Sequence, residues 1–198
     1  GGEISAWRGD AARSQEVKAV VAQADSILKA GVKVPQRNAQ WTFYYACPKD
    51  ASRLNEIDEE HHVCPVCKTV YSDERTQAAA RCVKHDQLNS QCHSLALAFA
   101  LSGDEKYAEA VKSKLVELAR LYQDWQHHDR WGRTGLLAVV GGWRYSQLLD
   151  EACSLIVLAK SYDLIASAAC ISDGERKIIE QDLLIGVARR ILKFQLFM

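Results

Sequence analysis

Apolar residues recur every three or four positions along most of the chain, the spacing that places side chains on one face of an α-helix. The first such stretch runs from Val17 to Leu28, and Gly31 follows it as a C-terminal stop. A second stretch begins after Asp73 and ends at Ser102-Gly103. Its apolar stripe consists of Leu88, Cys92, Leu95 and Phe99. Both stretches are predicted to be helices that bury one face.

Three further helices are predicted in the second half of the chain. Asp104 can cap the first of them, and a second runs from about Trp143 to Ile165. Ser172-Asp-Gly-Glu175 has the capping-box pattern and opens the last one, while the residues between Gln123 and Gly142 read as a loop. The inward-facing residues are Tyr107, Val111, Leu115, Leu118, Tyr122, Leu148, Ala152, Leu155, Ala159, Tyr162, Ile179, Leu183, Val187 and Ile191.

The fold class is therefore mainly α, built from antiparallel helical hairpins. Short connections between successive helices favour antiparallel neighbours. The chain shows no fixed-period repeat of the kind that solenoids have. Periodicity alone leaves a bundle and a closed α/α toroid equally open.

Residues 32–71 break the helical pattern. Trp41-Thr-Phe-Tyr-Tyr45 is β-prone, and it is followed by Cys47-Pro48, an acidic stretch and Cys64-Pro-Val-Cys67. We expect residues 40–71 to form a compact insert of short strands and turns.

The cysteines of this insert have the spacing of a metal site. Cys64 and Cys67 lie on one tight turn, from which both thiolates can reach a single tetrahedral Zn²⁺. His62, or else His61, is a candidate third ligand, and Cys47 a candidate fourth. A disulfide and free thiols are the alternatives, whereas a thioredoxin-type motif would need a βαβ setting. Four protein ligands leave no position for a reactive water, so the expected zinc ion is structural.

Composition excludes several functions. The 198 residues are 48% hydrophobic and 25% charged, and 25 basic residues balance 25 acidic ones. No net charge thus favours nucleic acid or an anionic membrane, and no apolar run is long enough for a membrane span. The start, Gly1 to Ser5, lacks the features of a signal peptide, and we expect the natural chain to continue beyond Met198. Cys92, Cys153 and Cys170 are predicted to be core residues.

The order of motifs resembles the N-terminal helical region of heparinase II/III-type polysaccharide lyases. The match covers roughly residues 40–165, and its weight lies in the order of several short motifs. Lys68 departs from it, because a glycine is expected after the second cysteine of the knuckle. The motifs are Phe43-Tyr-Tyr-Ala-Cys47-Pro48, His62 to Cys67, Val70-Tyr71, Leu97 to Ala108, Leu149-Asp-Glu151-Ala and Ser161-Tyr-Asp163-Leu-Ile165.

This resemblance implies a fold, a reaction and a compartment. Residues 1–198 would be the N-terminal part of an α/α toroid, followed in the family by a β-sandwich domain that this chain lacks. The reaction would be β-elimination at a uronic acid of a polysaccharide such as a glycosaminoglycan or an alginate-like polymer. The catalytic residues are expected beyond Met198, in the missing C-terminal part of the same polypeptide. The family also implies a periplasmic or secreted protein.

Two groups of residues are candidates for substrate binding. His85, Asn89 and His93 lie at i, i+4 and i+8, and they either face a groove or form a buried polar seam. The segment from Arg130 to Tyr145 is rich in arginine and tryptophan, which match carboxylates and sugar rings, although core tryptophans with solvated arginines would give the same pattern. The expected substrate-binding residues are Asn89, His93, Arg133, Trp143, Arg144 and Tyr145.

Other polar residues have structural or solvent-exposed roles in this reading. His127 and His128 are expected on the surface. Glu151 and Asp163 lie in apolar helices and are expected to be buried structural partners.

Two other functions fit a helical scaffold of this kind. An α/α-toroid glycoside hydrolase would need two carboxylates facing each other across a groove, and no such pair stands out in the sequence. A non-catalytic helical module that binds carbohydrate or protein would expose an apolar patch rather than an arginine-lined groove.

Overall fold

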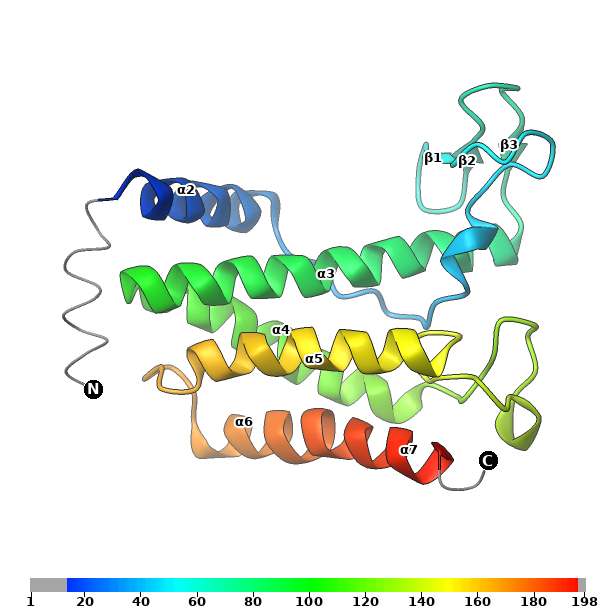
Figure 1. Cartoon of the computed structure of the whole chain (residues 1–198). Helices are drawn as coiled ribbons and strands as arrows, with labels where there is room; N and C mark the ends of the chain where they lie inside the picture. The colour runs from blue at the N-terminus through cyan, green and yellow to red at the C-terminus, as the bar shows by residue number, and fades with distance from the viewer. Residues whose placement is uncertain (1–13, 196–198) are drawn as a thin grey trace.

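The computed structural model describes residues 14–195, which form a mainly helical chain with a small sheet at one end (Figure 1). The expectations about the two ends of the chain rest on Gly1 to Ser5 and on Met198, which lie outside these residues. In order, the elements are α2 (Gln15–Ala30), the 3₁₀ turn η1 (Thr42–Tyr44), β1 (Asn55–Glu56), β2 (His62–Val63), β3 (Val70–Tyr71), α3 (Glu74–Ser102), α4 (Glu105–Asp124), the 3₁₀ turn η2 (Gly135–Leu137), α5 (Leu148–Ile165), α6 (Asp173–Lys177), the π-helical segment η3 (Ile178–Ile185) and α7 (Gly186–Gln195).

Polar side chains cap the starts of four helices. Ser14, Asp73 and Asp104 each accept a hydrogen bond from a backbone amide in the first turn of α2, α3 and α4. Ser172 and Glu175 form the complete capping box before α6. These contacts confirm the starts predicted at Asp73, Asp104 and Ser172, whereas α2 begins at Gln15, two residues before the predicted Val17.

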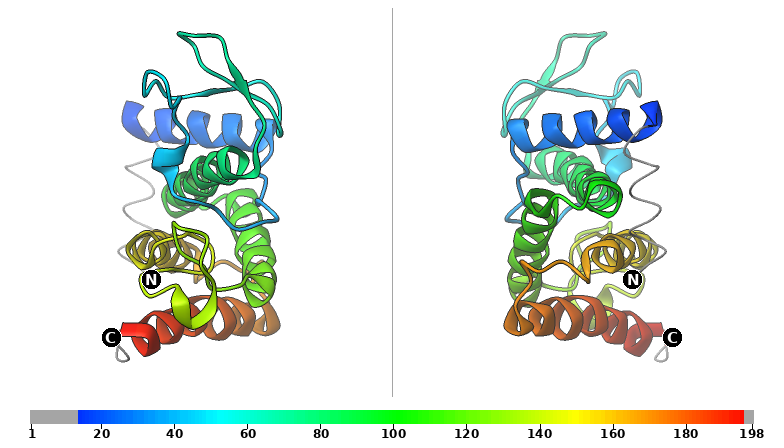
Figure 2. Two further views of the ribbon diagram at one scale, coloured as in Figure 1. Left: turned by 90° about the vertical axis from the view of Figure 1, so that its right-hand side faces the viewer. Right: turned by 90° about the vertical axis from the view of Figure 1, so that its left-hand side faces the viewer.

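The long helix α3 is the centre of the fold. It packs against α2, α4 and α5, and α4 packs in turn against η3. Figure 2 shows α4 along one side of the molecule, where it reaches from α3 to the α6–α7 segment. The fully buried core between these helices includes Leu95, Tyr107, Leu115, Leu118, Leu158, Ile165, Ile179 and Leu183. Most of the predicted inward-facing residues lie in this core, which confirms the helical periodicity.

Helix α5 starts five residues later than predicted, at Leu148 instead of Trp143. The buried carboxylate of Glu151 accepts hydrogen bonds from the backbone amides of Trp143, Arg144 and Tyr145 at 3.0–3.3 Å. Glu151 lies in the first turn of α5. Because the three amides donate to its side chain, residues 143–145 curl around this turn instead of extending the helix. Glu151 is thus a buried structural residue, as predicted.

The insert folds as a short antiparallel sheet in the order β1-β2-β3. His62 pairs with Glu56 on one side and with Tyr71 on the other. The insert lies at the N-terminal end of α3, and the long loop between α4 and α5 lies at the same end of the helices (Figure 1). The insert and this loop, which are far apart in sequence, therefore lie at the same end of the molecule.

Three expectations about single residues need correction. Asp163 is exposed rather than buried, because α5 turns this side chain away from its neighbours. Cys153 is exposed and Cys170 half-buried, whereas Cys92 does lie in the core. Among the described helices, none combines the length and the apolar character that crossing a membrane requires.

The buried Glu151 carboxyl generates a prediction about pH. Burial raises the pKa of Glu151 to about 7, even though the three backbone amides oppose the shift. Because folding raises this pKa, the acid contributes stability that is complete below its ordinary value of 4.5 and is lost as the pH rises through about 7. The loss is about 1.4 kcal/mol for each unit of the shift.

Urea unfolding of the wild type and of Glu151→Gln at about pH 5 and about pH 8 tests this expectation. The wild type should lose stability relative to the variant as the pH rises. A difference between the two proteins that stays constant across this range would contradict a raised pKa.

Candidate metal centre and arginine pocket

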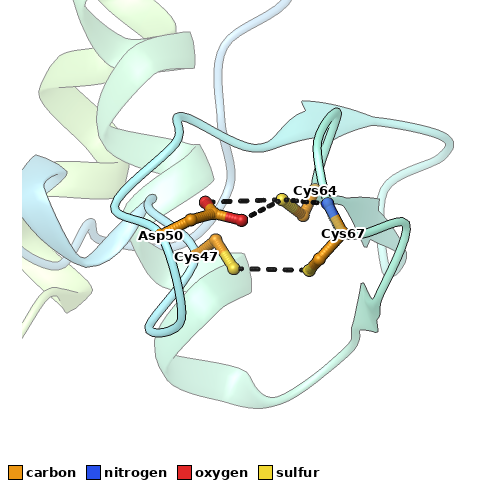
Figure 3. Close-up of side chains that lie close together, drawn as sticks. All are labelled: Cys47, Asp50, Cys64 and Cys67. Carbon is orange, nitrogen blue, oxygen red and sulfur yellow. Dashed lines mark hydrogen bonds between the residues drawn. The ribbon is translucent and has the colours of Figure 1, made fainter.

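The insert contains a tight turn, Cys47-Pro-Lys-Asp50-Ala-Ser52, which begins three residues after the last residue of η1. The Ala51 amide donates to the Cys47 carbonyl at 2.8 Å, and the Cys47 amide donates to the Ser52 carbonyl at 2.8 Å. Ala51 has a φ of 59°, in the left-handed region. The turn brings the side chains of its first and fourth residues, Cys47 and Asp50, to one side (Figure 3).

A second turn, Cys64-Pro-Val-Cys67-Lys-Thr69, repeats this construction. The Lys68 amide donates to the Cys64 carbonyl at 3.1 Å, and the Cys64 amide donates to the Thr69 carbonyl at 3.0 Å. Lys68 has a φ of 60°, which explains why a glycine is expected at this position. The two turns are equivalent, so Asp50 occupies in the first the place that Cys67 has in the second.

The four side chains at the equivalent positions form a cluster that could hold a metal ion. One ligand atom each from Cys47, Asp50, Cys64 and Cys67 lies within 4.8 Å of all the others. The Sγ atoms of Cys47 and Cys67 are 3.7 Å apart, and the Cys64 Sγ lies 3.3 Å from a carboxylate oxygen of Asp50 (Figure 3). Tetrahedral geometry with metal–sulfur bonds of about 2.3 Å and metal–oxygen bonds of about 2.1 Å requires separations of about 3.8 Å and about 3.6 Å. These two separations lie within about 0.3 Å of the tetrahedral values.

Hydrogen bonds from the second turn favour a thiolate at Cys67. Its pKa is lowered to about 7, mainly by the hydroxyl and the amide of Thr69. Burial raises the pKa of Cys64, while the Val66 and Cys67 amides donate to its sulfur and oppose this shift. A metal ion would stabilise the deprotonated form of both residues.

Neighbouring side chains support the cluster from outside. The Tyr71 hydroxyl lies 3.2 Å from the Cys47 sulfur, and this hydrogen bond raises the pKa of Tyr71 to about 12. The Asp50 carboxylate accepts from the Ser52 amide at 2.9 Å, which is the main reason why its pKa is lowered. Partners of this kind orient ligands in metal sites.

Neither candidate histidine belongs to the cluster. His62 is fully buried, its Nδ1 lies 2.9 Å from the Tyr45 hydroxyl, and its Nε2 has no hydrogen-bond partner in the described chain. His61 is exposed and pairs with Asp58 at 2.9 Å. The structure therefore puts Asp50 in the place that the sequence analysis gave to His62.

The sequence contains a signal for Asp50. Cys47-Pro-Lys-Asp50 and Cys64-Pro-Val-Cys67 share the Cys-Pro start and the spacing of the fourth residue. A search for repeated Cys-Pro turns would find it, whereas a search limited to cysteine and histidine ligands does not.

A second feature is a pocket of about 450 Å³ between the start of α3 and the loop before α5. We call it the arginine pocket. Trp131 on its rim is 54% exposed. Its lining residues are Asn38, Ala39, Gln40, Glu74, Arg75, Ala78, Arg81, His128, Arg130, Trp131 and Gly132.

Two guanidinium groups of this pocket lack a carboxylate partner among the described residues. Glu74 forms ion pairs with Arg81 at 2.6 Å and with Arg37 at 2.8 Å. Arg75 instead stacks on Tyr44, with its Cζ 3.5 Å from the ring centroid. Arg130 stacks on Trp131 at 4.2 Å and on Trp41 at 4.9 Å. Aromatic rings hold these two cations in place without neutralising them.

Arg144 is a structural residue rather than the substrate contact expected from the sequence. Its side chain has no exposed surface. It donates to the Nδ1 atom and the carbonyl of His85 and to the side chains of Asn89 and Ser154 at 2.7–3.0 Å. His85 and Asn89 therefore form the buried polar seam, one of the two expectations for this stripe.

The other predicted substrate contacts are scattered. Arg133 is partly exposed but pairs with the buried Asp129 at 2.7 Å. Tyr145 is buried and donates to Asp86 at 2.9 Å. Trp143 is half-buried, as is His93, whose Nδ1 has no hydrogen-bond partner in the described residues. The six residues do not share one open surface.

His127 and His128 are buried, contrary to expectation. The His127 Nδ1 lies 3.0 Å from the Gly135 carbonyl, and the His128 Nε2 lies 2.9 Å from the Ala39 carbonyl. Both rings anchor the loop before α5, and His128 ties it to the segment before η1.

Two comparisons with known sequences give no relative. No protein-family model matches the chain, and neither does any curated protein sequence. Functional conclusions therefore rest on the residues themselves.

The geometry of the cluster predicts which residues bind metal. Asp50→Ala and Cys64→Ser should lower the metal content of the purified protein, because each removes one of four ligands. His62→Gln should retain it, because His62 lies outside the cluster. Elemental analysis of the three variants measures this, and metal loss in His62→Gln with retention in Asp50→Ala would reverse the assignment.

The Arg144 network predicts a large effect on stability. Arg144→Ala would leave several buried polar groups without partners and create a cavity, so we expect a loss of about 3 kcal/mol or more in the free energy of unfolding. Arg133→Ala removes a partly exposed ion pair and should cost clearly less. Similar losses for both variants in urea unfolding would contradict the structural role of Arg144.

Proposed function

We propose that this chain is the N-terminal helical part of a polysaccharide lyase that acts on uronic-acid-containing polysaccharides. The observation that carries the proposal is the arginine pocket, in which Arg75 and Arg130 lack carboxylate partners beside the exposed ring of Trp131. The motifs from Phe43 to Ile165 that resemble heparinase II/III-type lyases support it independently.

The chemistry of the pocket suits an acidic sugar. A guanidinium group presents a planar fork that matches a carboxylate or a sulfate, and an exposed indole ring can stack on a sugar. Three arginines and one glutamate line the pocket, so its lining carries a net positive charge although the chain is neutral. A polymer with a charge on each sugar would be attracted to this site.

The proposed reaction needs three kinds of group. In β-elimination a donor neutralises the uronate carboxylate, a base removes the adjacent proton, and an acid protonates the leaving oxygen. We place these groups in a later part of the polypeptide, on a completed α/α toroid and a β-sandwich domain. The role of the present helices is to bind and orient the polymer, in the periplasm or outside the cell.

We also propose that the metal cluster holds zinc in a structural role. Three thiolates and one carboxylate are a donor set that suits Zn²⁺, and four protein ligands leave no open position. Cys47, Asp50, Cys64 and Cys67 would then brace the insert rather than take part in the reaction.

A glycoside hydrolase is the second candidate, and one observation favours it. Asp86 and Asp150 line one pocket of about 270 Å³ between α3 and α5, and burial raises the pKa of both carboxyl groups. Tyr145 donates to Asp86 at the base of this pocket. Paired carboxyl groups are what glycoside hydrolysis requires.

A non-catalytic binding module also has one observation in its favour. The loop around η2 exposes four apolar side chains: Leu136, Leu137, Val139 and Val140. A run of this kind often marks a surface that another molecule covers.

Binding of uronate polymers tests the proposed site. Arg75→Ala and Arg130→Ala should each weaken the affinity for a uronate oligosaccharide by about tenfold, because each removes an ionic hydrogen-bond donor. Arg120→Ala, which removes an exposed arginine of α4 outside the pocket, should leave the affinity unchanged. Isothermal titration calorimetry of the four proteins measures this.

The full polypeptide distinguishes the enzyme classes. A lyase releases an unsaturated product that absorbs in the ultraviolet, and the Arg75 and Arg130 variants should slow its formation. Reducing ends released without this absorbance would favour the hydrolase, and neither signal together with equal binding by all variants would favour the binding module.

A further inference from the structure

We propose that the metal ion positions one wall of the arginine pocket, so that the pocket is complete only when the Cys/Asp cluster is loaded. This inference rests on the proposed function for its ligand, an acidic sugar. It assigns Cys47, Asp50, Cys64 and Cys67 as positioning residues for a binding site that none of them lines.

The wall in question begins three residues before the first metal ligand. Tyr44 ends η1, and its ring supports the Arg75 guanidinium at 3.5 Å. The next residue, Tyr45, is buried in the small core of the insert together with Cys47 and Cys64. Its carbonyl accepts a hydrogen bond from the Leu54 amide at 3.3 Å. The position of Tyr44 is therefore set by the insert.

Arg75, the other member of the Tyr44–Arg75 stack, also lies shortly after a residue that contacts the cluster. Strand β3 ends at Tyr71, whose hydroxyl contacts the Cys47 sulfur at 3.2 Å. Asp73 then caps α3 through the Thr76 amide, and Arg75 lies in the first turn of the helix. Arg75 and Tyr44 thus meet because the chain enters and leaves the cluster at adjacent places.

The opposite wall has its own anchor. Asp129 is fully buried and accepts hydrogen bonds from the Trp131 and Arg133 amides at 2.9 Å and 3.0 Å. These contacts are within the loop and hold Trp131, whereas Arg130 also stacks on Trp41 and the Asp129 carbonyl accepts from Gln40, both at the start of the insert. Loss of the metal should therefore move the Tyr44–Arg75 wall most and the Trp131 side of the pocket least.

The insert cannot hold its shape by burial alone. Apart from two metal-ligand cysteines, the insert contributes only Tyr45 and Leu54 to the buried residues of this small core, and Tyr44 and Tyr71 pack against it partly buried. Burying two large side chains contributes only a few kcal/mol, about what it costs to order a handful of residues. Metal binding supplies the missing stability in small domains of this kind.

Hydrogen exchange compares the loaded and the stripped protein site by site. We would measure wild type with Zn²⁺, wild type treated with a chelator, Asp50→Ala, Asp50→Cys and the control Asp182→Ala, an exposed aspartate of η3. Stripped protein and Asp50→Ala should lose protection at the amides of Tyr44, Tyr45 and Leu54. The Trp131 amide and the middle of α3 should stay protected. Asp50→Cys keeps four ligands and should restore protection when Zn²⁺ is added.

Titration of the same samples with a uronate oligosaccharide completes the test. Affinity should fall at least about tenfold in stripped protein and in Asp50→Ala, and should return in Asp50→Cys with Zn²⁺. Unchanged protection at Tyr44 and Tyr45 after metal removal would overturn the inference, as would undiminished affinity in a stripped protein. If the loaded protein binds no uronate polymer while the protection of Tyr44 still depends on metal, the proposed function fails and the positioning by metal stands.

Discussion

The proposed metal ion, bound by four ligand atoms that lie within 4.8 Å of one another, would hold together a segment that has only a small apolar core. The helices do not need such help, because α3, α4, α5 and η3 bury a continuous set of large side chains. The insert instead depends on two equivalent turns that bring Cys47, Asp50, Cys64 and Cys67 together. The segments on either side of these turns, which are η1 with its aromatic residues and the first turn of α3, depend in turn on the positions of these four residues.

The buried Arg144 is a second polar centre. It joins the segment before η1 to helices α3 and α5. The Arg144 guanidinium binds His85 and Asn89 of α3 and Ser154 of α5, and the Arg144 carbonyl accepts from the Ala39 amide at 2.8 Å. The chain segment before η1 is thereby fixed to the loop before α5. The arginine pocket lies beside these contacts, which support the wall that the loop before α5 forms.

Sequence patterns with a local physical cause predicted the structure well. Helix ends followed from capping side chains such as Asp73 and Ser172, and the helix interiors followed from apolar spacing. The cysteines of the cluster followed from their spacing on tight turns. Failures arose where a distant partner decides the outcome. Nothing near Arg144 in the sequence shows that His85 and Asn89 will surround its charge, or that Glu151 will bind the three amides before it. Asp50 was missed for another reason. Aspartate is a common surface residue, and only the equivalence of its position to that of Cys67 identifies it as a candidate metal ligand.

The two proposed roles are that the metal cluster braces the insert and that the arginine pocket binds the polymer. A crystal structure of the protein with a uronate oligosaccharide, with anomalous data at the zinc edge, tests both statements at once. The expected result is one zinc ion bound by Cys47, Asp50, Cys64 and Cys67, and a uronate carboxylate in contact with Arg75 or Arg130. An ion bound elsewhere, or a sugar bound between Asp86 and Asp150 instead, would contradict it.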